Sequence, residues 1–178
     1  GTHESKDTLL WLSYAKQRFP NLQIFLLGVS MGAATVLMMS DQILQQDVKG
    51  IIADCAYTSA WDEFKYQLKT SFHLPAFPIL HICDLLCRLY AHYSFKDASP
   101  VDHVKHAKVP VLFIHGKEDD FVPFYMEKEL YDACGSEKTL LAVDGAVHAR
   151  SYHRNSALYE KTLHSFFEKY SRVFSERK

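Results

Sequence analysis

The segment Gly-Val-Ser-Met-Gly at residues 28–32 constrains the fold more than any other part of this chain. It follows the apolar run at residues 23–27, which is typical of a buried strand, and precedes a helix predicted over residues 33–44. A serine between two glycines at such a junction is the pattern of a nucleophile elbow. The sharp turn strains the serine backbone, and tiny residues at positions 28 and 32 let helix and strand pass closely. We therefore expect the Ser30 hydroxyl to stand clear of a β-sheet beside the start of a helix.

Size and charge set limits on the class of protein. The 178 residues fit one domain, expected over residues 1–178, and 48% hydrophobic content is ordinary for a globular core. A formal net charge of −1 provides no attraction to nucleic acid or to an anionic membrane, so neither is an expected partner. The chain begins at Gly1 with no methionine and no signal-peptide pattern, so we expect a piece of a longer protein or a processed product.

The cysteines favour free thiols in a reducing compartment, and the predicted localisation is cytoplasmic. They lack the spacing of a disulfide framework. The four are Cys55, Cys83, Cys87 and Cys134. Although Cys83 and Cys87 would share a helix face near His81, no second ligand pair accompanies them, so no metal site is predicted.

Strand-like and helical segments alternate along the chain, which predicts an α/β fold with a mostly parallel sheet flanked by helices. The expected strands cover residues 23–27, 50–55, 109–115 and 138–143. The expected helices cover residues 4–18, 33–44, 123–134 and 155–170. Continuous apolar runs in the strands indicate a sheet that is covered on both faces.

A long connection between residues 55 and 109 interrupts this alternation. It is longer than an ordinary strand-to-helix connection. We predict a helical cap insertion over about residues 60–105 that roofs a site. Its aromatic side chains are expected mostly to bury the insertion against the body, with a minority lining a pocket. They are Trp61, Phe64, Tyr66, Phe72, Phe77, Tyr90 and Tyr93.

A serine nucleophile needs a base, usually histidine, and a carboxylate that orients the base. Residues 115–123 read His-Gly-Lys-Glu-Asp-Asp-Phe-Val-Pro, and residues 144–148 read Asp-Gly-Ala-Val-His. Both segments follow predicted parallel strands, whose carboxyl ends gather functional sites in α/β sheets. His148 stands out by position as the candidate base. The candidate acids are Glu118, Asp119 and Asp120, whereas His115 is expected to be structural.

In order and spacing, these motifs resemble the α/β-hydrolase superfamily over essentially the whole chain. Within it they resemble bacterial serine aminopeptidase-like or acyl-peptidase-like esterases. The resemblance implies that Ser30 is the nucleophile, Asp119 the orienting acid, with Asp120 as the alternative, and His148 the general base. It also implies that the Met31 backbone N–H is an oxyanion donor. The implied reaction transfers an acyl group to water through an acyl-serine intermediate and needs no metal or organic cofactor.

The chain departs from this family at its front, where the amino-terminal strands are lacking. We therefore expect the strand at residues 23–27 to be covered by a second copy, as in a homodimer, or by the missing amino-terminal half. In this family a loop among the lacking strands supplies a second oxyanion N–H, and that loop has no counterpart here. We therefore expect turnover to be lower by a factor of roughly 10²–10³. Because relatives can carry an amino-terminal membrane segment, a membrane-anchored parent stays open.

The favoured function is a serine hydrolase that cleaves carboxylic ester, or acyl-amide, bonds of small molecules. Two alternatives stay open: a non-catalytic fragment or binding module of hydrolase fold, and a small-peptide aminopeptidase. Asp54, at the end of the second expected strand, is predicted to cap the next segment.

Overall fold

The computed structural model describes residues 2–44 and 47–171, so the predicted domain of residues 1–178 extends into positions outside these ranges. The strands are β1 (Phe25–Val29), β2 (Gly50–Asp54), β3 (Val111–Gly116) and β4 (Lys138–Val143). The longer helices are α1 (Thr2–Arg18), α3 (Ala60–Thr70), α4 (Ile79–Ala91), α6 (Phe124–Ala133) and α8 (Ser156–Ser171). The shorter helices are α2 (Met31–Leu37), α5 (Pro100–Val104) and α7 (Ser151–Arg154).

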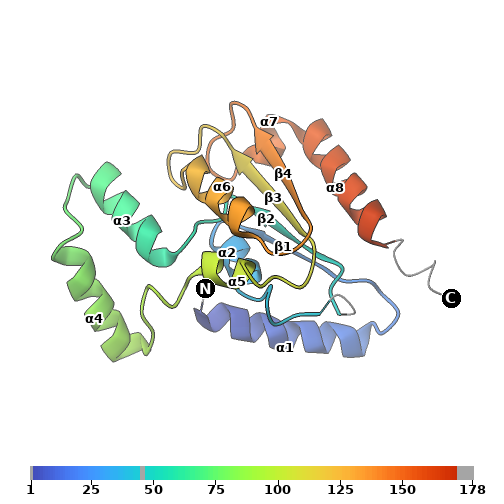
Figure 1. Cartoon of the computed structure of the whole chain (residues 1–178), viewed down its shortest axis with the longest axis horizontal. Coiled ribbons are helices and arrows are strands. Elements are labelled where there is room, and N and C mark those ends of the chain that lie inside the picture. The colour runs from blue at the N-terminus through green and yellow to red at the C-terminus, as the bar shows by residue number, and fades with distance from the viewer. Residues whose placement is uncertain (1, 45–46, 172–178) are drawn as a thin grey trace.

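The four strands form one parallel sheet in the order β1-β2-β3-β4, with helices on both faces (Figure 1). Alternate residues of the central strands enter two separate cores. Ile51 and Phe113 pack toward α2 and α6, whereas Ile52 and Leu112 pack toward α8. The predicted α/β class, with a parallel sheet covered by helices, is confirmed.

Two elements at the elbow have bounds that differ from the sequence prediction. The strand begins at Phe25 rather than residue 23 and continues through Val29 to the serine. The following helix ends at Leu37 rather than residue 44, because the N–H groups of Met39 and Ser40 bond to carbonyls three residues back. Such tightened turns end an α-helix. The other expected elements agree within two residues, and α7 was not predicted.

The segment between β2 and β3 carries α3, α4 and α5. In Figure 1, α3 and α4 project to the left of the sheet, whereas α5 packs against α2 and α6. The expectation that aromatic side chains here are mostly buried is wrong for Phe64, Phe72, Phe77 and Tyr90, which are exposed. The reason is that α3 and α4 extend from the body and leave much of their surface uncovered.

Apolar surface is also exposed at β1, which forms an edge of the sheet and pairs only with β2 within the described residues. Leu27 is 51% exposed and Val29 is 42% exposed. Cover by a second copy or by preceding chain stays a prediction. Across residues 2–44 and 47–171, no helix combines the length and hydropathy that crossing a bilayer requires.

Candidate active site

The turn at Ser30 has the strained geometry that the sequence predicted. Ser30 has φ 54° and ψ −117°, between β1 and α2. Its N–H donates to the Asp54 carbonyl over 2.8 Å, and its carbonyl accepts from the N–H of Ala34 over 3.0 Å. These two bonds hold the strained residue from both sides.

The two glycines of the motif have different roles. A Cβ on Gly28 would lie 2.2 Å from the Gly32 carbonyl oxygen, so only glycine fits there. Apart from its chain neighbours and the backbone of its own helix, a Cβ on Gly32 would meet no described atom within 4 Å. The expectation that both positions need a tiny residue is therefore wrong for Gly32, because its Cβ direction leads into open space.

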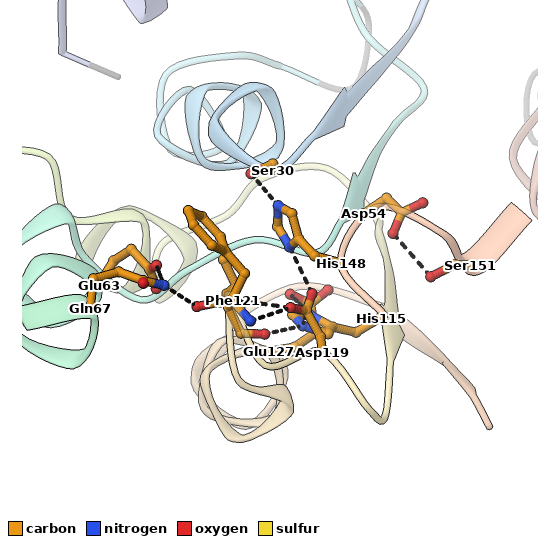
Figure 2. A network of polar contacts seen from close by, with 11 residues as sticks. Ser30, Asp54, Glu63, Gln67, His115, Asp119, Phe121, Glu127, His148 and Ser151 are labelled. Atoms are coloured by element: carbon orange, nitrogen blue, oxygen red, sulfur yellow. Dashed lines mark hydrogen bonds and ion pairs between the residues drawn. The ribbon is translucent and has the colours of Figure 1, made fainter. Parts of the chain in front are cut away.

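Ser30, His148 and Asp119 form a continuous hydrogen-bonded line (Figure 2). His148 Nδ1 lies 2.8 Å from Asp119 Oδ2, and His148 Nε2 lies 2.9 Å from Ser30 Oγ. A carboxylate can only accept, so Nδ1 carries the proton and Nε2 is free to accept from the serine hydroxyl. This tautomer is the one that a general base requires.

The Asp119 side chain is fully buried, and both of its carboxylate oxygens have hydrogen-bond partners. Its Oδ1 accepts from the N–H groups of Phe121 and Val122 over 3.0 and 2.9 Å. Burial raises the pKa of this carboxyl, but hydrogen bonds from His115 and His148 outweigh burial and lower the pKa to about 2. Asp119 therefore stays charged beside the imidazole at neutral pH.

The two neighbouring acids lie elsewhere. Asp120 is exposed, and the hydrogen bond and ion pair of His148 Nδ1 are with Asp119 instead. The Glu118 carboxylate accepts from the N–H of Gly145 and so ties the acid loop to the loop that carries the histidine. Of the three candidate acids, the geometry brings only Asp119 to the imidazole.

The stability that Asp119 contributes should depend on pH. Its folded-state pKa is about 2 against an ordinary 3.8, so its contribution is complete above pH 3.8 and is lost as pH falls through 2. The free energy of unfolding should therefore differ between wild type and Asp119→Asn by an amount that changes with pH. We expect this pH-dependent part to be about 2 kcal/mol at pH 6. Urea unfolding should show the difference shrinking toward pH 3. A difference that is equal at both pH values would contradict this electrostatic assignment.

The loop that holds His148 is anchored by Asp54. The Asp54 carboxylate accepts from Tyr159 Oη over 3.1 Å and from Ser151 Oγ over 3.3 Å, and burial raises its pKa. The prediction that Asp54 caps the next segment is wrong, because Ser59 accepts from the N–H of Asp62 and caps α3, the helix of that segment. Asp54 instead fixes the segment just after the histidine.

A buried ionisable pair behind the acid was missed from the sequence. His115 Nε2 lies 2.8 Å from the Val122 carbonyl and 3.2 Å from Asp119 Oδ2, while Nδ1 lies 3.4 Å from Glu127 Oε2. Burial raises the pKa of Glu127 to about 7. Burial lowers the pKa of His115, but hydrogen bonds with Asp119 and Glu127 outweigh it and raise the pKa. One signal in the sequence could have revealed that Glu127 is buried. This residue lies beside the apolar positions 126 and 130, which form the buried face of α6.

An apolar pocket of about 190 Å³ opens beside the serine. Met31, the first residue of α2, lines it, and first-turn N–H groups of a helix have no partner within that helix. Met31, the residue of the predicted oxyanion donor, therefore lines the same pocket as Ser30. Tyr57 and Phe121 form further parts of the wall, and the Phe121 ring lies 4.9 Å from the His148 ring.

Among the described residues, one cluster has the donor spacing of a metal site: Cys55, Asp119 and His148. Burial raises the pKa of the Cys55 thiol to about 12, so this group is a protonated thiol at neutral pH. The other two members are hydrogen-bonded to one another. The donor set therefore does not favour a metal centre.

The parallel sheet, the strained serine and the serine–histidine–aspartate line together define an α/β hydrolase. Solved structures share this fold. The acylaminoacyl peptidase of Pyrococcus horikoshii superposes with TM-score 0.72 at 19% identity, covering 97% of this chain and 28% of that one. The esterase Pf2001 of Pyrococcus furiosus superposes with TM-score 0.71 at 18% identity, covering 96% of this chain and 63% of that one.

The chain belongs to the prolyl oligopeptidase family, whose model matches residues 1–173. It is 33% identical over 141 residues to the uncharacterized protein YqkD of Bacillus subtilis, covering 79% of this chain and 46% of YqkD. It is 24% identical over 140 residues to the lysophosphatidylserine lipase ABHD12 of Danio rerio, covering 76% of this chain and 35% of that protein. The chain thus spans less than half the length of these curated relatives.

Proposed function

We propose that this chain carries the catalytic centre of a serine hydrolase that cleaves carboxylic esters through an acyl-serine intermediate. The observation that carries the proposal is the pair of bonds at His148, one to Ser30 and one to Asp119. Membership of the prolyl oligopeptidase family and the likeness to an esterase and an acylaminoacyl peptidase support hydrolysis in general. The apolar pocket beside Ser30 supports an acyl group as the part of the substrate that is bound there.

In this mechanism Ser30 Oγ attacks the ester carbonyl carbon while its proton passes to His148 Nε2. Asp119 stabilises the imidazolium through Nδ1–H, and the N–H of Met31 donates to the developing oxyanion. The tetrahedral intermediate then expels the alcohol, which takes the proton from Nε2, and leaves the acyl group on Ser30. A water molecule repeats the sequence on the acyl-serine and releases the carboxylic acid.

Covalent labelling tests this proposal directly. A fluorophosphonate probe should label the complete natural protein once per chain, with the adduct located on Ser30 by mass spectrometry, because only an activated serine attacks such a probe at a useful rate. Ser30→Ala should abolish labelling, whereas Ser13→Ala, on the exposed side of α1, should leave it unchanged. Wild-type protein that is folded and stays unlabelled would favour the non-catalytic alternative. Rates with aminoacyl anilides and with esters then separate a peptidase from an esterase.

A further inference from the structure

One face of α3 lines two neighbouring apolar spaces. Ala60, Glu63, Phe64 and Gln67 border the pocket that contains Ser30. Phe64, Gln67 and Leu68 border a second space, a groove of about 270 Å³ between α3 and α4. These positions recur at helical spacing, so they form one continuous stripe along α3. The stripe from Ala60 to Leu68 advances roughly 12 Å, the extended length of roughly ten carbons.

The far wall of the groove comes from α4 and from Phe95. Ile79, Leu80 and Cys83 lie in the first two turns of α4 and line the groove. The Phe95 ring packs edge-on against Phe64, with 4.8 Å between ring centres, at the junction with the Ser30 pocket. Taken together, the pocket and the groove fall within the usual range of small-molecule sites, ~300–1,000 Å³.

Two polar side chains, Glu63 and Gln67, lie along the stripe and are hydrogen-bonded to each other. Gln67 Nε2 donates to Glu63 Oε1 over 2.9 Å and to the Phe121 carbonyl over 2.6 Å (Figure 2). Glu63 Oε2 is buried without a hydrogen-bond partner, and burial raises the pKa of this carboxyl toward the neutral form. The groove beyond Phe64 is walled by apolar atoms. A peptide backbone there would lose its hydrogen bonds to water without replacement, whereas an alkyl chain loses nothing.

We propose that the Ser30 pocket and the α3–α4 groove form one site for the linear acyl chain of a medium-chain fatty-acyl ester. The ester carbonyl lies at Ser30, and the chain passes Phe64 to end between Leu68 and Cys83. This inference rests on the proposed hydrolase function and narrows its substrate class. The observation behind it is that Phe64 and Gln67 line both spaces, so that the two lie side by side along α3.

The test is a chain-length series of p-nitrophenyl esters, from acetate to decanoate, kept below their micelle concentrations, with the complete natural protein. Each buried methylene should raise kcat/KM about threefold, up to roughly ten carbons. Cys83→Trp fills the groove and should lower the decanoate-to-acetate ratio of kcat/KM at least tenfold. Leu85→Trp, on the outer side of α4 where residue 85 is 56% exposed, is the matched control and should leave the ratio unchanged.

The proposed acyl-chain site and the proposed hydrolase activity can be tested separately. Decanoate should bind the Ser30→Ala protein in isothermal titration calorimetry, and binding should weaken at least tenfold in Ser30→Ala/Cys83→Trp. A wild type that prefers acetate, or a Cys83→Trp variant with an unchanged ratio, would overturn the groove. If neither labelling nor ester cleavage occurs, calorimetry still tests the groove. Decanoate binding that is weakened by Cys83→Trp would support the acyl-chain site, and no decanoate binding would reject it.

Discussion

Ser30→Ala, His148→Ala and the double variant should all lose about the same factor in kcat, on the order of 10⁶. The reason is that the serine hydroxyl and the imidazole act as one unit, joined by the 2.9 Å contact between Oγ and Nε2. Removing either group removes proton transfer and nucleophilic attack together, so the second substitution has nothing left to remove. Steady-state kinetics on a short-chain ester measures this.

His106→Ala, which alters an exposed histidine outside the site, should retain wild-type kcat. Strictly additive losses in the double variant would mean that Ser30 and His148 act independently. That result would contradict the shared proton transfer on which the mechanism depends. Circular dichroism of each variant separates a loss of chemistry from a loss of fold.

Gly28→Ala should be the most destabilising small substitution in the elbow. The added methyl group would lie 2.2 Å from the Gly32 carbonyl oxygen, and this atom belongs to backbone that cannot rotate away. Strand β1 and helix α2 would have to separate, which we expect to lower the free energy of unfolding by about 3–5 kcal/mol. Fluorophosphonate labelling of Ser30 should fall with it, because the strained turn would open.

Gly32→Ala is the matched substitution two residues beyond the serine. Its methyl group meets nothing within 4 Å, and alanine favours a helix over glycine, so stability should be unchanged or rise by up to about 1 kcal/mol. Urea unfolding of the two variants measures the contrast. Equal destabilisation of both would show that the space beside Gly32 is filled in the complete protein.

Local signals were strong enough to predict the sheet, Ser30 and His148, whereas Asp119 was chosen over Glu118 and Asp120 by the resemblance to the α/β-hydrolase superfamily. The apolar runs at residues 109–115 and 138–143 mark β3 and β4 within two residues. The loops after these strands contain Asp119 and His148, which the parallel topology brings to the same edge as Ser30. Motif order and strand ends therefore placed the serine, the histidine and the acidic segment at one edge of the sheet.

Features that depend on tertiary packing escaped prediction. Glu127 is a charged residue in a helical pattern, and only the packing of α6 behind the acid loop buries it against His115. The early end of α2 at Leu37 likewise has no glycine or proline to signal it. The outward projection of α3 and α4 depends on which surfaces find a partner, which composition does not reveal.

Asp54 forms hydrogen bonds with the turn at Ser30 and with residues that follow His148. Its carbonyl oxygen fixes the backbone of Ser30, and its carboxylate fixes Ser151 and Tyr159 just beyond His148. The end of β2 therefore supports both the turn that carries Ser30 and the segment that follows His148. We expect a shift of this strand to move the nucleophile and the base in the same direction. Ser30 and His148 are therefore positioned from the same strand end, whereas α3 and α4 supply walls of the neighbouring apolar spaces.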